Sequence, residues 1–202
     1  MAIVIGITGS LCSGKTTAAS IFAKLGAVII DADRIVHRLI QKDGTCFRDV
    51  VSAFGTDVVS KDGINRRKLA DIVFKDKEKL RQLENIIHPA VVKEIKKQVE
   101  EFKKTNTDNA VLVLDVPLLF ESGLSTVTDF NIVVNASYEE RIKRAINKLK
   151  ISRADAVRRI SAQMPVREKI RMADFVLDNN KGKQHMRKQL KNICREILGE
   201  RK

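Results

Sequence analysis

The residues best suited to chemistry lie in one octapeptide, GSLCSGKT, at positions 9–16. Its spacing, G-x-x-x-x-G-K-[ST], is typical of a loop whose backbone N–H groups surround phosphate oxygens. Lys15 would reach the β- and γ-phosphates of a nucleoside triphosphate, and the Thr16 hydroxyl would ligate Mg²⁺. An apolar run precedes the octapeptide and an amphipathic stretch follows it, which is the strand–loop–helix context that the motif needs. The predicted nucleotide-binding residues of this loop are Gly9, Ser10, Leu11, Cys12, Ser13, Gly14, Lys15, Thr16 and Thr17.

Two carboxylates, Asp31 and Asp33, close the next apolar run. Residues two apart in an extended chain point to the same side. A carboxylate there could orient an attacking hydroxyl and take its proton. Alternatively, Asp33 is the N-cap of a helix that starts at RIVHRL. The spacing alone leaves the role of base and the role of cap equally open.

A third acid, Asp115, ends the apolar run VLVLD. An acid at that place in a phosphate-loop protein often holds Mg²⁺, usually through water. The following residues, Pro117, Leu118, Leu119 and Phe120, are too apolar for an exposed loop, so they could line an acceptor pocket. For Leu118 alone, we favour a plain role in the core.

Cys12 lies beside Lys15 and the start of a predicted helix, which would lower the pKa of its thiol. A small buried filler is an equally good interpretation. The three cysteines are far apart and odd in number, which predicts neither a disulfide framework nor a zinc site and fits a reducing cytoplasm. No residue near His88 has metal-ligand spacing, so we expect no metal there.

Alternating apolar runs and helical patterns must position these groups. We expect strands at 3–8, 27–31, 111–116, 130–134 and 175–177. One helix would bury Ala18, Ile21, Phe22 and Leu25 and end at Gly26. Other helices are expected at 33–41, 45–54, 138–148, 152–173 with an interruption near Pro165, and from the last strand to the end. The charged stretch 65–104 would begin at an Asn65 N-cap and bend between helices at His88-Pro89, before a loop at 105–109.

This order predicts an α/β fold: a doubly wound parallel sheet of about five strands, with ligands beyond the carboxyl ends of the strands. No apolar run approaches the roughly 20 residues of a membrane span, and the start of the chain lacks the features of a signal peptide. A cytoplasmic protein with no membrane partner is expected.

The net charge of +13 is concentrated in two segments. Residues 141–171 hold eleven Lys or Arg against two acids, and residues 181–202 hold eight against two. Such segments suit either a nucleic-acid binder or an enzyme that closes a basic flap over a triphosphate. Tyr138 is the one aromatic residue besides phenylalanine, so base stacking is poorly supplied. For residues 181–202 we favour a solvated helix face.

Taken together, these motifs resemble the dephospho-coenzyme A kinase family over nearly the whole chain. The resemblance rests on the phosphate loop, on Asp31-Ala32-Asp33 followed by IVH, on RRKLADIVF at 66–74, and on His88-Pro89. It continues through DVPLLFESG at 115–123, ERIKRA with Arg141 and Arg144, RRISAQ at 158–163, and MADFVLDNN at 172–180.

The resemblance implies transfer of the ATP γ-phosphate to the ribose 3′-hydroxyl of dephospho-CoA, with Mg²⁺. It implies a P-loop kinase core (about 1–35, 108–140 and 172–202), a helical acceptor-binding region (about 36–107) and a lid (about 141–171). It makes Asp33 the better candidate for the base, and Arg144 the arginine that meets the transferring phosphate. Gln163 and Asn179 would lie near the nucleotide. The acceptor side would comprise Asp31, His88, Pro117, Leu118, Leu119, Phe120 and Glu121.

The chain departs from the family pattern at Ser10 and Cys12, where the family usually has more glycine, and at Lys148, where it usually has a second lid arginine. Lysine cannot make the planar two-pronged contact with phosphate. The alternative enzyme is a nucleoside or nucleoside-monophosphate kinase of the same fold. A nucleic-acid-binding ATPase is the alternative from another class. A GTPase is disfavoured because no N-K-x-D sequence is present. We expect no nucleic-acid partner and favour a monomer.

Overall fold

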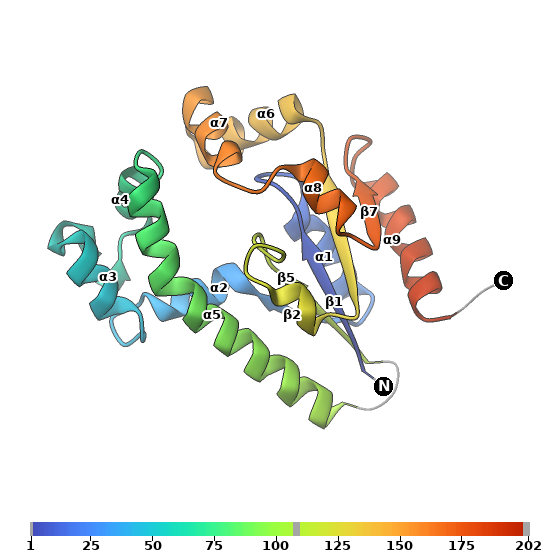
Figure 1. Ribbon diagram of the computed structural model, residues 1–202. Coiled ribbons are helices and arrows are strands. Elements are labelled where there is room, and N and C mark those ends of the chain that lie inside the picture. The colour runs from blue at the N-terminus through green and yellow to red at the C-terminus, as the bar shows by residue number, and fades with distance from the viewer. Residues whose placement is uncertain (1, 107–109, 200–202) are drawn as a thin grey trace. The chain divides into compact units, whose positions relative to one another are not determined.

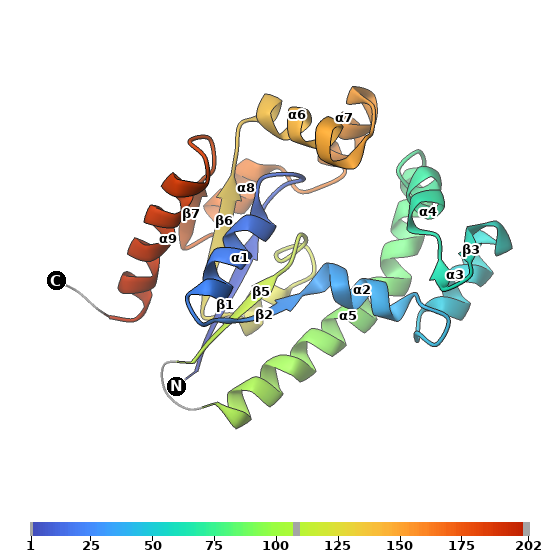
Figure 2. The same ribbon diagram turned by 180° about the vertical axis from the view of Figure 1, so that it is seen from behind.

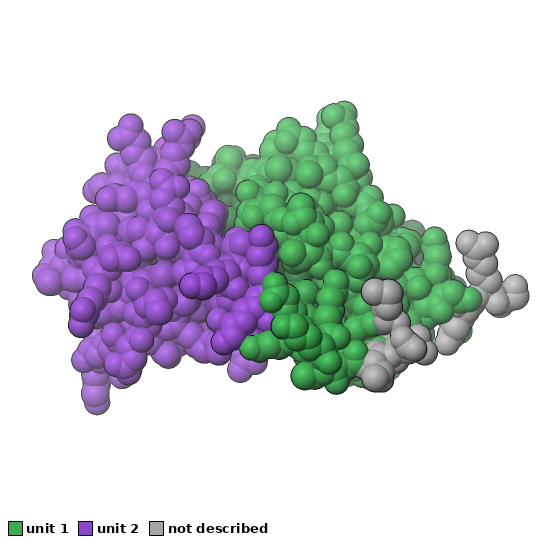
Figure 3. Space-filling model, turned by 60° about the horizontal axis from the view of Figure 1, so that its bottom comes forward, with its two compact units in different colours: residues 1–30, 99–202 green, residues 31–98 purple. Residues whose placement is uncertain are grey.

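The structure is a computed structural model that describes residues 2–106 and 110–199. It divides into two compact units, residues 1–30 with 99–202 and residues 31–98 (Figure 3). The ranges expected for the core and the acceptor-binding region include residues 1, 107–109 and 200–202, which lie outside the described residues. The same is true of most of the loop expected at 105–109. Its first residue, Thr105, is the last residue of a helix.

The larger unit is built on a five-stranded sheet in the order β2-β5-β1-β6-β7 (Figure 1). Its pairs β1–β5, β1–β6 and β6–β7 are parallel. The predicted α/β fold with a parallel sheet of about five strands is therefore confirmed. The strands are β1 (Ile3–Thr8), β2 (Val28–Asp31), β5 (Val111–Asp115), β6 (Phe130–Asn135) and β7 (Phe175–Asp178).

One face of the sheet is covered by α1 (Lys15–Lys24) and α9 (Lys183–Ile197), as Figure 2 shows. Their buried side chains, among them Phe22 and Leu190, join strand residues such as Ile7 in one apolar cluster. This burial fixes the start of α1 directly behind the end of β1. The described basic residues of 181–199 are exposed, which confirms the solvated face expected there.

The helix α1 ends one residue earlier than the apolar spacing predicted. Leu25 is the C-cap and is 45% exposed rather than buried. Gly26 follows with φ +95°, and its N–H donates to the Ala23 carbonyl, so the glycine closes the helix as expected.

The opposite face carries α8 (Val166–Arg171) and the turns at 117–123 (Figure 1). Gly6 makes this approach possible, because a Cβ at that position would lie 2.7 Å from Cδ2 of Leu119. Two further helices, α6 (Tyr138–Leu149) and α7 (Arg153–Ser161), follow β6. The expected interruption near Pro165 is present between α7 and α8.

Residues 31–98 contain α2 (Ala32–Leu39), α3 (Phe47–Phe54) and α4 (Arg66–Val73). Between α3 and α4 lie the short helix η1 (Thr56–Val58) and a hairpin of β3 (Val59–Ser60) and β4 (Gly63–Ile64). This hairpin was not predicted, because two-residue strands are too short to show alternation. The Asn65 N-cap is confirmed, since its side chain accepts from the N–H groups of Arg67 and Lys68, both at 3.1 Å.

The division into two helices expected at His88-Pro89 is wrong. One continuous helix, α5 (Lys77–Thr105), runs through Pro89. Proline removes one N–H from the helical ladder and crowds the preceding turn. Ile86 lies in that turn, and its carbonyl accepts a hydrogen bond from the Cys46 thiol at 3.8 Å. Packing of the buried side chains Ile87, Val91 and Ile95 along the helix outweighs the local preference of proline.

Candidate active site

The loop between β1 and α1 ends in a helix N-terminus that suits an anion. Gly14 is the N-cap with φ +106°, and no side chain of the described residues caps this terminus. The first N–H groups of a helix have no partner inside the helix, and the helix dipole adds positive potential there. Gly14 is required also for space, because a Cβ would lie 2.0 Å from Nδ2 of Asn179.

Lys15, at this N-terminus, forms an ion pair with Asp115 at the end of β5. Adjacent parallel strands explain the pairing, since Ile7 of β1 is in register with Asp115. Both side chains are largely shielded from water, with exposures of 12% and 3%. A buried carboxylate therefore lies beside Lys15, the cation that the sequence predicts to contact the phosphates.

The Ser13 hydroxyl is buried and has no hydrogen-bond partner among the described residues. An unsatisfied buried polar group is costly, so it marks a place where a ligand atom can complete the hydrogen bonding. With the uncapped helix and Lys15, it gives the loop the donors that a polyphosphate needs.

The oxygen atoms of Thr16 and Asp115 fit the preference of Mg²⁺ for hard ligands. Thr16 is exposed at the start of α1, and Asp115 lies beside Lys15. Within residues 2–106 and 110–199, no group of three His, Cys, Asp or Glu side chains could hold a metal. A site completed by phosphates needs no such group, because Mg²⁺ is commonly bound by one or two carboxylates plus substrate oxygens.

Gln163, which follows α7, contacts the loop itself. Its Oε1 accepts from the Leu11 N–H at 2.8 Å and from the Ser10 hydroxyl at 3.1 Å. Asn179 likewise donates from Nδ2 to the Ser13 carbonyl at 2.7 Å. Both residues are therefore joined to the phosphate loop, where the resemblance had placed them near the nucleotide.

Arg144 of α6 lies across the same part of the loop. Its guanidinium donates to the Asn179 carbonyl at 3.0 Å and to the Ser13 carbonyl at 3.4 Å, and it pairs with Glu140 at 2.9 Å. The structure thus brings together the loop, Asp115, Arg144, Gln163 and Asn179 in one unit.

Arg141 contacts the loop, and no role was predicted for it from the sequence. It is buried, and it donates to the Ser10 hydroxyl at 2.5 Å and to the Ala136 carbonyl at 3.1 Å. Burial lowers the pKa of its guanidinium. Arg141 lies one turn before Arg144 on α6 and belongs to the ERIKRA motif. Its contact with Ser10 could not be predicted, because 131 residues separate the two and no local pattern indicates such a contact. Ser10, where glycine is usual, is thus the residue that Arg141 holds.

The lowered thiol pKa expected for Cys12 is wrong. Burial raises the pKa of Cys12, and this outweighs the opposing effect of Lys148 and Arg144. Cys12 packs against the apolar cluster between α6 and α7 that includes Ile142 and Ala156. It is a small filler, and it adopts φ +57° at the tip of the loop.

The segment 117–121 packs on the sheet and does not form an exposed loop. Leu119 is fully buried and Phe120 is 8% exposed, whereas Leu118 is partly exposed. The core role favoured for Leu118 therefore belongs to Leu119. The Pro117 carbonyl accepts from the Thr8 hydroxyl at 2.9 Å, which ties this segment to the end of β1.

Asp31, Asp33 and His88 belong to the unit of residues 31–98. Asp31 is the N-cap of α2, and its Oδ1 accepts from the N–H groups of Asp33 and Arg34 at 2.9 and 3.3 Å. The cap role considered for Asp33 is therefore wrong, since Asp33 lies in the first turn with an exposed side chain. His88 is partly buried on α5.

A cavity of about 460 Å³ opens elsewhere in the larger unit. Its lining includes Val28 and Val111, the first residues of β2 and β5, together with Phe22 and Arg195. None of the candidate site residues lines it, so its volume says nothing about the phosphate loop.

No helix of the described residues is long and apolar enough to cross a membrane.

Comparison with known proteins agrees with this geometry. The model of the family described as dephospho-CoA kinase matches residues 3–185. The dephospho-CoA kinase of Carboxydothermus hydrogenoformans is 40% identical over 96% of this chain and 93% of its own length. The solved structure of dephospho-CoA kinase from Campylobacter jejuni is 29% identical, with a TM-score of 0.71 over 99% of each chain. A shikimate kinase from Acinetobacter baumannii, 14% identical with a TM-score of 0.58 over 100% of this chain and 96% of its own, shares the fold. The chain belongs to the dephospho-CoA kinase family.

Proposed function

We propose that this protein transfers the γ-phosphoryl group of ATP to the ribose 3′-hydroxyl of dephospho-CoA, giving coenzyme A and ADP. The observation that carries the proposal is the uncapped N-terminus of α1, with Lys15 in its first turn, in a chain that belongs to this family. The relatives are named for dephospho-CoA, and they match this chain over nearly their whole length.

Phosphoryl transfer needs alignment and charge neutralisation more than covalent help from the protein. The N–H groups at the start of α1 and the ammonium of Lys15 hold the phosphates. The Ser13 hydroxyl is a further donor within the loop. The links from Gln163, Arg141 and Asn179 keep the loop in its binding shape.

Thr16 and Asp115 would hold Mg²⁺, which neutralises charge on the phosphates when bound. The Asp115 carboxylate pairs with Lys15. Both side chains are already shielded from water, so little further desolvation is needed when ATP binds.

The acceptor hydroxyl must lose a proton as its oxygen forms the new bond to phosphorus and the bond between phosphorus and the ADP oxygen breaks. Asp33 takes this proton. Its carboxylate is available for the role because Asp31, and not Asp33, caps α2. Asp31, His88 and the segment 117–121 contribute to acceptor binding.

Arg144 stabilises the charge that develops as ADP leaves. Its contacts with the Ser13 and Asn179 carbonyls already place its guanidinium on the loop. The basic segment 141–171 acts as the lid that keeps water from the phosphoryl group, which accounts for its charge without a nucleic-acid partner. We place this activity in the cytoplasm and expect a monomer.

An acceptor panel tests the proposal. The protein is mixed with Mg-ATP and, in separate reactions, dephospho-CoA, AMP, thymidylate, uridine or RNA, and ADP release is followed. Release that depends on dephospho-CoA supports the proposal. Release with AMP, thymidylate or uridine instead would make the protein a nucleotide or nucleoside kinase, and salt-sensitive stimulation by RNA would favour a nucleic-acid-dependent ATPase.

A further inference from the structure

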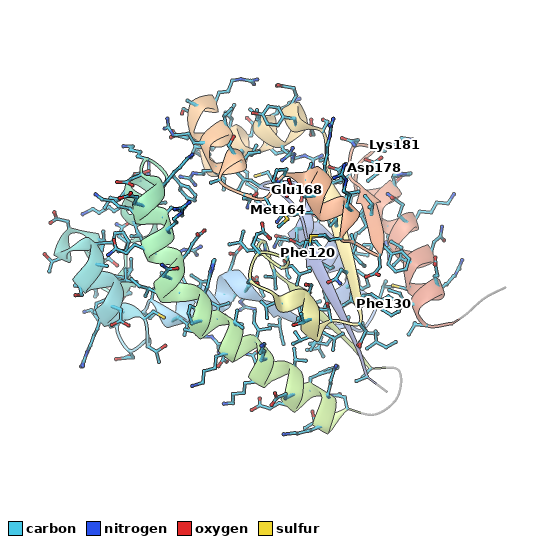
Figure 4. The ribbon with its side chains drawn as sticks, viewed as in Figure 1. Phe120, Phe130, Met164, Glu168, Asp178 and Lys181 are labelled. Carbon is cyan, nitrogen blue, oxygen red and sulfur yellow. The ribbon has the colours of Figure 1, made fainter. Side chains whose placement is uncertain are left out.

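Lys169 of α8 is a fully buried cation that has no role in the phosphate site described above. Its side chain has 0% exposure. A buried ammonium is costly unless it is paired and hydrogen-bonded. Lys169 is both, because its Nζ lies 2.8 Å from Oε1 of Glu121 and donates to the Pro117 carbonyl, also at 2.8 Å. Figure 4 labels Phe120 and Glu168, which directly precede Glu121 and Lys169 in the sequence.

The two partners of Lys169 are the ends of one short segment, 117–121. Each end has a second donor. The Pro117 carbonyl also accepts from the Thr8 hydroxyl at 2.9 Å, directly before the phosphate loop. The Glu121 carboxylate also accepts from the Met164 N–H at 3.3 Å, directly after Gln163. The segment is therefore held between the end of β1 and the stretch that joins α7 to α8.

Burial lowers the pKa of Lys169, and Glu121 opposes this effect. Lys15 also lowers it, since a second positive charge acts on the same region. An ordinary core position would hold an apolar side chain at less cost. Lys169 is a single buried cation that contacts both ends of the segment. Its presence is better explained if it holds these two ends in a fixed geometry.

We propose that Lys169 is a positioning residue that sets the geometry of segment 117–121 for the acceptor, and so links acceptor binding to α8. This inference rests on the proposed function. It changes the role of Glu121, whose carboxylate accepts from Lys169 and Met164 and acts on the acceptor through the segment. The Lys169 side chain is a direct link between α8 and the segment.

The test uses Lys169→Met, Glu121→Gln and the double variant, with Lys188→Met as a control, because Lys188 is an exposed cation of α9 outside the proposed lid. Lys169→Met is expected to lower kcat/KM for dephospho-CoA by about 10²-fold, the scale of a misplaced substrate. The dissociation constant for ATP should stay near the wild-type value, and Lys188→Met should change neither quantity.

The double variant separates positioning from stability. Glu121→Gln leaves an unpaired buried ammonium and should lower the unfolding temperature, and removal of both charges should restore it. A positioning role predicts that kcat/KM for dephospho-CoA stays low in the double variant although its stability recovers. Recovery of both quantities together would make the pair purely structural and overturn the proposal.

Hydrogen exchange gives a readout that needs no acceptor. In Lys169→Met, the amides of residues 118–125 should exchange faster, among them Ser122 and Ser125, which donate to the Leu118 and Leu119 carbonyls. Unchanged exchange would overturn the inference whatever the acceptor is. If the wild-type enzyme releases no ADP with dephospho-CoA, the proposed function fails, and the same variants are then assayed with the acceptor that the panel identifies.

Discussion

Lys15 at the start of α1 and Asp115 at the end of β5 form an ion pair across the carboxyl ends of two neighbouring parallel strands. The pair joins the phosphate loop to the strand that leads into segment 117–121. The nucleotide side and the proposed acceptor side of the larger unit thus meet at one shielded carboxylate.

Asp33→Asn should leave ATP binding nearly intact and slow phosphoryl transfer by about 10²–10⁴-fold, the usual contribution of a positioned proton acceptor. The amide keeps the size of the side chain but cannot take the proton. Single-turnover rates and ATP titrations measure the two effects separately. A normal transfer rate would remove Asp33 from the mechanism.

Asp31→Ala should lower the free energy of unfolding by about 0.5–2 kcal/mol, because α2 loses its N-cap. Denaturant unfolding measures this change. Asp33→Ala is the matched control: Asp33 lies two residues away, is exposed and caps nothing among the described residues. Equal losses in the two variants would contradict the assignment of the cap to Asp31.

Arg144→Ala should reduce kcat more than it weakens acceptor binding, since its charge is needed as the bond to ADP breaks. Steady-state kinetics with dephospho-CoA as the varied substrate separate the two terms. Lys143→Ala, an exposed cation beside it on α6, serves as the control. A raised KM with an unchanged kcat would make Arg144 a docking residue only.

The Cys12 thiol should be mostly protonated at neutral pH, because burial raises its pKa above the ordinary value. Alkylation, which requires the thiolate, should therefore have its pH midpoint above that of a free thiol. Mass spectrometry of the modified protein over a pH series gives the midpoint for each cysteine. A midpoint below that of glutathione would restore the idea of an activated thiol.

The features that the sequence predicted well depend on short-range rules. The phosphate loop, the Asn65 cap and the interruption near Pro165 each follow from a few neighbouring residues with fixed backbone preferences. The order of strands and helices follows from apolar runs of ordinary length.

The features that it missed depend on contacts between distant residues. Pro89 has the local signature of a helix end, yet burial along α5 keeps the helix continuous. Arg141 and Lys169 look like ordinary members of a basic segment. Their roles depend on partners 131 and 52 residues away, Ser10 and Pro117, and no spacing rule connects them. For Cys12, charge proximity was visible in the sequence, but the burial that outweighs it was not.

The most direct test of the central claim follows the phosphoryl group itself. ATP labelled in its γ-phosphate is incubated with Mg²⁺, dephospho-CoA and either the wild-type protein or Lys15→Ala, and the labelled products are separated. We expect the wild-type protein to move the label to the 3′-phosphate of coenzyme A and Lys15→Ala to move none. Label found only in inorganic phosphate, or equal transfer by Lys15→Ala, would contradict it.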